Sequence, residues 1–144
     1  MTQMRVQDVW PLSPLQEGLL FHAVYDERGI DVYVEQLVLD LEGRLDPAVL
    51  RASWQALLDR HESLRAGFRQ LAGVAQPVQV IARGVELPWR EEDLSGLDAD
   101  TARAESERLG IEERERRFDL AVPPLLKVLL VKVGPDVYRM MVTL

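Results

Sequence analysis

The chain has 144 residues, of which 47% are hydrophobic and 28% charged, with a formal net charge of −7 and no cysteine. A chain of this length buries about 68–70% of its extended surface on folding, which is enough for one hydrophobic core. This composition argues against disorder, a disulfide framework, a thiolate nucleophile and a nucleic-acid partner. No apolar stretch approaches the roughly 20 residues that span a bilayer, and there is no secretory signal, so a cytoplasmic location without membrane contact is expected.

The first predicted helix covers residues 12–24. Ser13 can cap its N-terminus, Pro14 suits its first position, and Gln16 completes a Ser-x-x-Gln capping box. Residues 19–24 are nearly all apolar, so this helix is expected to be buried on most sides.

Residues 33–43 alternate between apolar and polar side chains, which predicts a half-exposed strand. A second helix is expected from Asp46-Pro47, where a capping residue precedes a proline at the first helical position. Its apolar stripe at helical spacing is expected to face the core and consists of Leu50, Trp54, Leu57, Leu58 and His61.

The remaining strands are short, apart from a hairpin predicted at the end of the sequence. Strands are predicted at 64–69 and 78–81, with a further one at 85–89. Two apolar runs, 125–133 and 137–144, are separated by Gly-Pro-Asp, which predicts a β-hairpin. This order of elements implies one mixed sheet with helices packed on it, an α/β fold of the α+β sandwich type.

A charged helix is predicted over residues 98–116. The overlapping segment 103–117 holds five Arg and five Glu, so its net charge is zero. The expected ion pairs are Glu112–Arg116 and Glu113–Arg117, each in the favourable i,i+4 order. A solvated helix face is therefore expected here rather than a basic binding patch.

Candidate catalytic residues are few. The sequence contains no metal-ligand cluster, no Gly-x-Ser-x-Gly elbow and no glycine-rich phosphate loop. The only histidines are His22 and His61. His22 is most simply a helix-terminal residue that bonds a last-turn carbonyl, and His61 a structural residue that orients the end of the second helix. A general base would need a partner and a pocket, and the sequence shows these for neither histidine.

Arg60 and Arg65 lie at or just after the end of the second helix. Their guanidinium groups could hold a carboxylate in bidentate geometry. Alternatively, they form surface ion pairs with Glu62 or Asp59, worth about 0–1 kcal/mol. Spacing alone supports both interpretations equally.

Three sequence blocks carry recognisable motifs. Ser13, Gln16 and Phe21 form the pattern Ser-x-x-Gln-x-x-x-x-Phe. Residues 60–68 form the pattern Arg-His-Glu-x-Leu-Arg-x-x-Phe, and residues 117–126 resemble a Pro-Phe-Asp-Leu-x-x-x-Pro-Leu-Leu segment. In order and spacing these blocks resemble motifs of the condensation domains of nonribosomal peptide synthetases, and the resemblance covers nearly the whole chain.

The resemblance implies that residues 1–144 form the N-terminal lobe of a chloramphenicol-acetyltransferase-like fold, with residues 1–5 as a tail. The whole domain of this family forms an amide bond between an acyl or peptidyl donor and an aminoacyl acceptor. Both substrates arrive on phosphopantetheine arms of peptidyl carrier proteins, so no cofactor or metal is expected to bind directly. Alternatives are an epimerization, ester-forming or stand-alone acyltransferase relative, or a non-catalytic carrier-binding module.

The family's active-site motif, His-His-x-x-x-Asp-Gly, has no match in this sequence, and the resemblance places it just beyond Leu144. No catalytic residue is therefore assigned within the chain. The resemblance makes Arg60 or Arg65 the candidate to pair with the motif's aspartate, with His61 as further support. The first motif supplies a scaffold formed by Ser13, Gln16 and Phe21.

The missing motif has consequences for the isolated chain. It is expected to lack condensation activity and the C-terminal lobe that forms the other wall of the substrate tunnel. Strand 137–144 is expected to be an exposed apolar edge that promotes self-association. Because Met1 lies shortly before the first motif, the chain fits the start of a synthetase polypeptide that receives a donor ending in a D-residue from another polypeptide.

Overall fold

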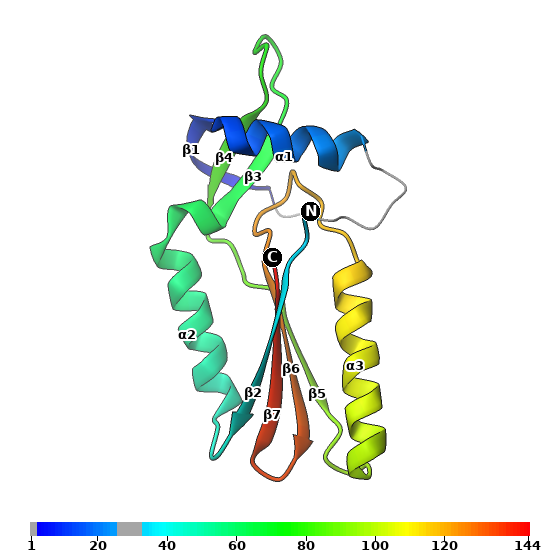
Figure 1. The fold of residues 1–144 in the computed structure, drawn as a ribbon. Coiled ribbons are helices and arrows are strands. Elements are labelled where there is room, and N and C mark those ends of the chain that lie inside the picture. The colour runs from blue at the N-terminus through cyan, green and yellow to red at the C-terminus, as the bar shows by residue number, and fades with distance from the viewer. Residues whose placement is uncertain (1–2, 26–32) are drawn as a thin grey trace.

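The strands of this protein form two sheets (Figure 1). The structure is a computed structural model that describes residues 3–25 and 33–144. Within these residues the elements are β1 (Arg5–Pro11), α1 (Pro14–Tyr25), β2 (Gln36–Glu42), α2 (Pro47–Arg60), the 3-10 helix η1 (Glu62–Arg65), β3 (Ala66–Arg69), β4 (Val78–Arg83), β5 (Trp89–Asp93), α3 (Ala99–Glu115), β6 (Lys127–Gly134) and β7 (Val137–Thr143).

The larger sheet has the strand order β2-β7-β6-β5, with β5 parallel to β6 and the other neighbours antiparallel. Helix α2 covers one face and helix α3 the other (Figure 1). Because side chains alternate along a strand, Val128 and Leu130 of β6 pack in the cluster of Leu58 from α2, whereas Leu129 packs with Leu109 from α3. The expected mixed sheet with helices packed on it is confirmed.

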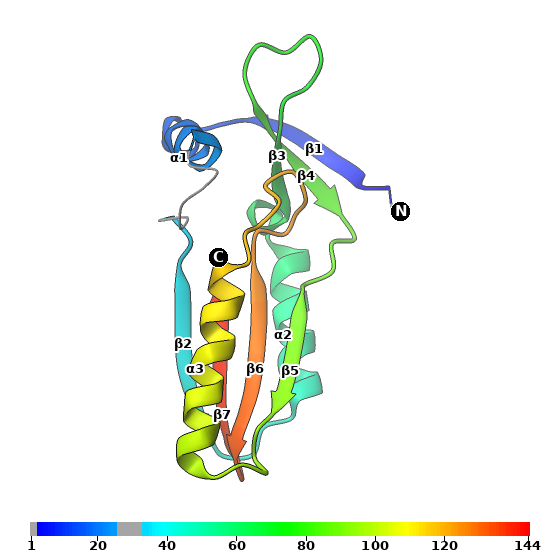
Figure 2. The ribbon, with the colours of Figure 1, turned by 90° about the vertical axis from the view of Figure 1, so that its right-hand side faces the viewer.

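The smaller sheet has the order β1-β4-β3, is antiparallel, and lies with α1 at one end of the larger sheet (Figures 1 and 2). The sequence implied a single sheet and did not predict β1. The register of β1 on β4 shifts between Val6 and Asp8, and this irregularity interrupts the alternation that identifies a strand. Arg5, expected in a terminal tail, pairs with Arg83.

Helices α1 and α2 begin where local capping predicted, and α3 has a cap that was not predicted from the sequence. The Ser13 hydroxyl accepts a hydrogen bond from the Gln16 amide at 3.2 Å, and the Gln16 side-chain oxygen accepts one from the Ser13 amide at 2.8 Å, which confirms the capping box. The Asp46 carboxylate accepts from Ala48 N at 3.0 Å at the start of α2. The Asp98 carboxylate accepts from Thr101 N at 2.9 Å at the start of α3.

Helix α1 is apolar but not buried. The sequence predicted burial on most sides, yet none of its residues is buried and Leu15 is 73% exposed. The prediction is wrong because, among the described residues, α1 packs mainly against the small sheet and the loop of residues 118–121, so most of its side chains stay accessible to solvent (Figure 2). No helix in the described part of the chain is long and apolar enough to cross a membrane.

Strand β5 replaces the strand predicted at 85–89. Gly84 adopts a positive φ of 63°, and Pro88 has no amide hydrogen to donate. Residues 85–87, between these two positions, therefore do not belong to a strand. Val85 and Leu87 are buried nonetheless, which explains their apolar character. The strand that does form, 89–93, was not predicted from the sequence because four of its five residues are charged.

The core-facing stripe of α2 is narrower than predicted. Leu50, Trp54 and Leu58 pack into the core at a spacing of four residues, and Leu58 is fully buried. Leu57 is 45% exposed, and His61 is exposed beyond the end of the helix. The expectation that these two residues face the core is therefore wrong.

Helix α3 forms as predicted, but its charged side chains use other partners. Glu113, expected on a solvated face, is only 2% exposed. It pairs with Arg116 at 2.8 Å and with Arg90 of β5 at 3.1 Å, while Glu112 pairs with Arg90 and Arg108. The tertiary contact with β5 therefore redirects the pairs that helical spacing alone suggested.

Strand β7 is an interior strand and not an exposed edge. It pairs with β2 along one side and with β6 along the other. Tyr138, Met140 and Val142 are buried in the core. The expected exposed edge at residues 137–144 is therefore wrong, because the backbone groups and apolar side chains of this strand are already engaged, and self-association through it loses the reason given for it.

Candidate functional site

The three sequence blocks meet at a cavity of about 180 Å³, and they also line a neighbouring cavity of about 670 Å³ to which Phe21 contributes. Gln16, Leu19 and Leu20 come from the first block, Phe68 from the second, and the third contributes further apolar side chains. The described residues that line the smaller cavity are Gln16, Leu19, Leu20, Ala23, Tyr33, Val34, Phe68, Phe118, Leu120, Leu125 and Leu144. Residues far apart in the sequence thus form one site, where α1 lies above the end of the larger sheet.

The second block reaches the cavity through β3. The amide of Phe68 donates a 2.7 Å hydrogen bond to the carbonyl oxygen of Leu120, and Arg69 Nε donates to the carbonyl oxygen of Ala121 at 3.2 Å. The approach is close because position 67 is glycine. A Cβ atom there would lie 2.9 Å from the Ala121 oxygen and 3.0 Å from Pro123 Cδ.

The loop of the third block is held at both ends. Asp119 accepts from the amide of Ala121 at 3.0 Å, and the peptide bond between Pro123 and Pro124 is cis. At the other side, Lys127 Nζ donates to the carbonyl oxygen of Arg116 at 2.7 Å and lies 4.8 Å from the ring centroid of Phe118. Burial lowers the pKa of Lys127, because removal from water disfavours the charged amine.

Helix α1 is tied to the small sheet through two glutamines. Gln79 of β4 donates from Nε2 to the side-chain oxygen of Gln16 at 3.2 Å and to the carbonyl oxygen of Pro11 at 3.0 Å. Gln79 is 9% exposed and was not singled out from the sequence. The sequence feature that could have identified Gln79 is its place as the one amide in the apolar run 78–82. A polar side chain at a buried strand position needs a hydrogen-bond partner.

Arg65 is buried and bonded to neutral acceptors. It is 7% exposed, and its Nε donates to the carbonyl oxygen of Leu58 at 3.0 Å. Its Nη1 donates to the carbonyl oxygen of Ala82 and to the Gln7 side chain, both at 2.7 Å. These bonds connect α2, β4 and β1 at the point where the second block enters β3.

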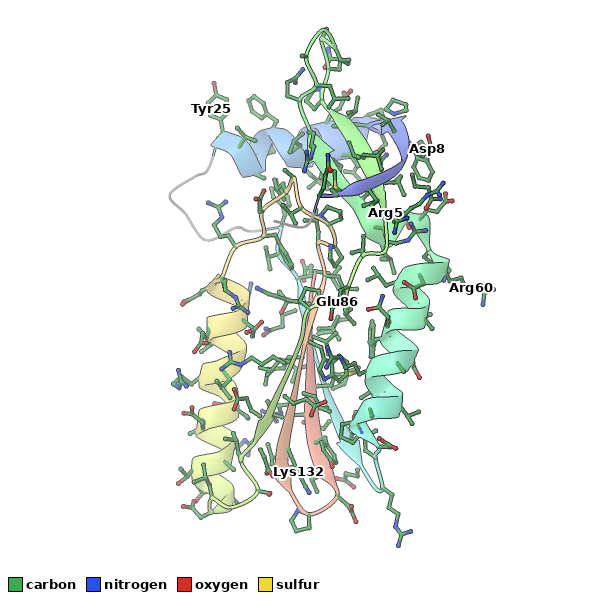
Figure 3. All side chains as sticks on the ribbon, turned by 180° about the vertical axis from the view of Figure 1, so that it is seen from behind. Arg5, Asp8, Tyr25, Arg60, Glu86 and Lys132 are labelled. Atoms are coloured by element: carbon green, nitrogen blue, oxygen red, sulfur yellow. The ribbon has the colours of Figure 1, made fainter. Side chains whose placement is uncertain are left out.

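Arg60 lies elsewhere. It is exposed at the end of α2 and projects away from the ribbon (Figure 3). The ion pairs found within residues 3–25 and 33–144 include neither Arg60 nor Arg65, and neither residue lines the cavity. The structure therefore shows no surface pair with Glu62 or Asp59 for either arginine.

Phe21 and the two histidines also lie outside the lining of the smaller cavity. Phe21 is 57% exposed, and its ring contacts those of His22 and Tyr25. The exposed His22 ring lies 5.8 Å from the ring of Tyr33. His61 ends α2 through its backbone amide, which donates to the carbonyl oxygen of Leu57 at 3.1 Å.

The lining determines what this cavity can do. Apart from Gln16 and Tyr33 its side chains are apolar, so it can exclude water and hold an uncharged group. Within residues 3–25 and 33–144, the side chains that line it include no histidine and no Asp or Glu that could move a proton near neutral pH. Among the described residues, no group of three or more His, Cys, Asp or Glu could hold a metal ion.

Comparison with known sequences and structures gives a consistent result. The family model described as "Condensation domain" matches residues 6–144. The chain is 34% identical to bacitracin synthase 1 of Bacillus licheniformis over 136 residues, which is 94% of this chain and 2% of that protein. It is 33% identical to gramicidin S synthase 2 of Brevibacillus brevis, over 94% of this chain and 3% of that protein.

Solved structures with the same fold are also similar. The first condensation domain of the calcium-dependent antibiotic synthetase superposes with a TM-score of 0.83 at 22% identity, covering 96% of this chain and 33% of that one. The starter condensation domain of rhizomide synthetase gives a TM-score of 0.82 at 20% identity, covering 95% and 32%. The chain thus spans about a third of these structures and only 2% and 3% of the two curated relatives.

Proposed function

This chain belongs to the condensation domain family, and from that membership we propose that it is part of a domain that joins two carrier-bound substrates by an amide bond. In this reaction the acceptor amine attacks the thioester carbonyl carbon of the donor. A C–N bond forms, the C–S bond breaks, and the donor's phosphopantetheine arm leaves as a thiol while the amine loses a proton. The observation that carries the proposal is the meeting of three separated sequence blocks around the smaller cavity.

In this proposal the chain supplies the walls of the site and not the group that accepts the proton. Ser13 and Gln16 hold α1 above the cavity through the capping box and Gln79. Arg65 supports the site by bracing the turn from α2 into β3, with His61 at the end of the same helix. The proton transfer would need a His-His-x-x-x-Asp-Gly motif, which the 144 residues do not contain. The 144-residue polypeptide alone is therefore expected to form no product.

The exposed apolar side chains of α1 support a contact with another protein surface. Leu15, Phe21, Val24 and Tyr25 are between 56% and 79% exposed, and Tyr25 points outward at the end of the helix (Figure 3). Apolar side chains gathered on one exposed helix are typical of an interaction site. We assign the donor and acceptor carrier proteins, or the second lobe of the domain, as the partners of this surface, and we place the protein in the cytoplasm with them.

The test is a chimera with a relative. Residues 6–144 replace the matching segment of bacitracin synthase 1, and the purified domain is mixed with donor-loaded and acceptor-loaded carriers. Intact mass spectrometry of the acceptor carrier is expected to show the condensed product. The 144-residue polypeptide in the same assay is expected to show none, and circular dichroism verifies that both proteins are folded.

Each outcome separates the alternatives. A folded chimera that forms no product would contradict the proposed contribution to condensation, and binding of carriers without turnover would identify a non-catalytic module. An ester or an epimerised donor in place of the amide would assign a different reaction to the same fold. Product from the 144-residue polypeptide alone would overturn the claim that it lacks the base.

A further inference from the structure

Lys127 is a buried cation that contacts Phe118, one of the residues lining the cavity of about 180 Å³. It is the first residue of β6 and only 7% exposed. Its ammonium group donates to the carbonyl oxygen of Arg116 at the C-cap of α3, and it also faces the ring of Phe118 at 4.8 Å. One charged group therefore contacts both the end of a helix and an aromatic side chain that lines the site.

The neighbouring charges explain why the Phe118 ring is needed to stabilise the ammonium group of Lys127. Glu113 of α3 is the acidic group that favours the charged form of Lys127, but its carboxylate is bonded to Arg90 and Arg116. The ion pairs identified among the described residues do not include Lys127. The direct contacts that stabilise the charge of Lys127 are thus one carbonyl oxygen and the negative face of an aromatic ring. A cation over a ring is attracted more strongly when it is desolvated.

We propose that Lys127 is a positioning residue that orients the Phe118 ring and thereby sets the shape of the cavity. Phe118 lies two residues after the C-cap residue Arg116, and a lysine that only capped the helix would not hold this ring. The contact with both groups instead couples the ring to the helix end. The effect on product formation rests on the proposed function, whereas the effect on the ring does not.

Three variants distinguish positioning from simple helix capping. Lys127→Met keeps an unbranched apolar side chain but removes the ammonium group, and Lys127→Arg keeps a positive charge. Lys132→Met is the matched control, because Lys132 lies on the same strand and faces a different ring, that of Tyr138 at 5.9 Å. All three variants are made in the 144-residue protein with 4-fluorophenylalanine at position 118 and a Tyr33→Phe background, since the Tyr33 phenol also lines the cavity.

The readout is the ¹⁹F resonance at position 118 between pH 7 and about pH 11. It is expected to titrate with a midpoint below the usual lysine value of 10.5, because burial lowers the pKa of Lys127. Lys127→Met should shift the resonance and abolish the titration, Lys127→Arg should keep a single resonance without titration, and Lys132→Met should behave like the parent. A resonance unaffected by Lys127→Met would overturn the proposal.

The chimera then tests the consequence for the reaction. Lys127→Met is expected to slow product formation about 5- to 30-fold, whereas Lys127→Arg stays within about twofold of the parent. An unchanged rate in Lys127→Met, despite a shifted resonance, would overturn the role in the reaction. A parent chimera without any product would count against the proposed function instead, and the resonance would still decide whether Lys127 orients the ring.

Discussion

The backbone amide of Phe68 donates a 2.7 Å hydrogen bond to the carbonyl oxygen of Leu120, and both side chains line the cavity. Phe68 lies on β3, an edge strand of the small sheet, while Leu120 lies in the loop that leads into β6 of the large sheet. This bond therefore fastens the loop of the third block to the strand of the second. It also connects the two sheets at the site itself.

Gly67→Ala is expected to weaken this connection. The added methyl group would lie 2.9 Å from a backbone oxygen of Ala121, which cannot move aside as a flexible side chain can. We expect the free energy of unfolding to fall by about 1–3 kcal/mol in urea denaturation. Gly18→Ala is the control, because nothing lies within 4 Å of the new methyl group and alanine favours the helix by about 1 kcal/mol. Equal losses in the two variants would contradict the close approach at β3.

Arg65→Met is expected to destabilise the protein more than Arg60→Met. Removing the Arg65 guanidinium leaves the buried carbonyl oxygens of Leu58 and Ala82 without their donor, at a cost of about 1–3 kcal/mol. Arg60 is exposed, so its substitution should change the stability by no more than about 0.5 kcal/mol. Thermal or urea unfolding of both variants measures the difference. Similar values would show that the bonds of Arg65 contribute little.

Leu58→Ala and Leu57→Ala test which face of α2 packs on the sheet. Leu58 is fully buried, so its truncation should cost about 2–5 kcal/mol through lost transfer energy and the cavity left behind. Leu57 is 45% exposed, and its truncation should cost about 0.5 kcal/mol. Urea denaturation of the two neighbours gives the comparison. A large loss of unfolding free energy for Leu57→Ala would instead support the wider apolar stripe that the sequence suggested.

Asp98→Asn is expected to make α3 less sensitive to acid. The backbone amide of Thr101, and then its hydroxyl, donate to the Asp98 carboxylate and lower its pKa from 3.8. Because the folded pKa lies below the unfolded one, the contribution of this carboxylate is present above the unfolded pKa and is lost as the pH falls through the folded pKa.

Asparagine caps a helix about as well as aspartate but does not titrate. The variant should therefore lose less stability than the parent between about pH 5 and pH 2 in urea denaturation. Parallel losses in the two proteins would show that the Asp98 cap contributes nothing to acid unfolding.

The sequence predicted those parts of the site and fold whose causes are local. The three sequence blocks indicated the family, and the matching family model confirms it. The starts of α1 and α2 were predicted because a cap and its partner lie within one helical turn, as in Ser13 with Gln16. The turn between β6 and β7 was predicted from Gly-Pro-Asp, and Asp136 adopts a φ of 51° there.

The tertiary structure alone decided which residues meet. Gln7 bonds Arg65 from 58 positions away, and Gln79 reaches Gln16 from 63 positions away. Strands β1 and β5 have weak patterns of their own and form because β4 and β6 supply their hydrogen-bond partners. The interior place of β7 likewise depends on β2, which lies 99 positions earlier at the paired residues Asp40 and Arg139. Local sequence determines caps and turns because their free energy depends on neighbours in the chain, whereas strand pairing and buried polar contacts depend on partners that only folding brings together.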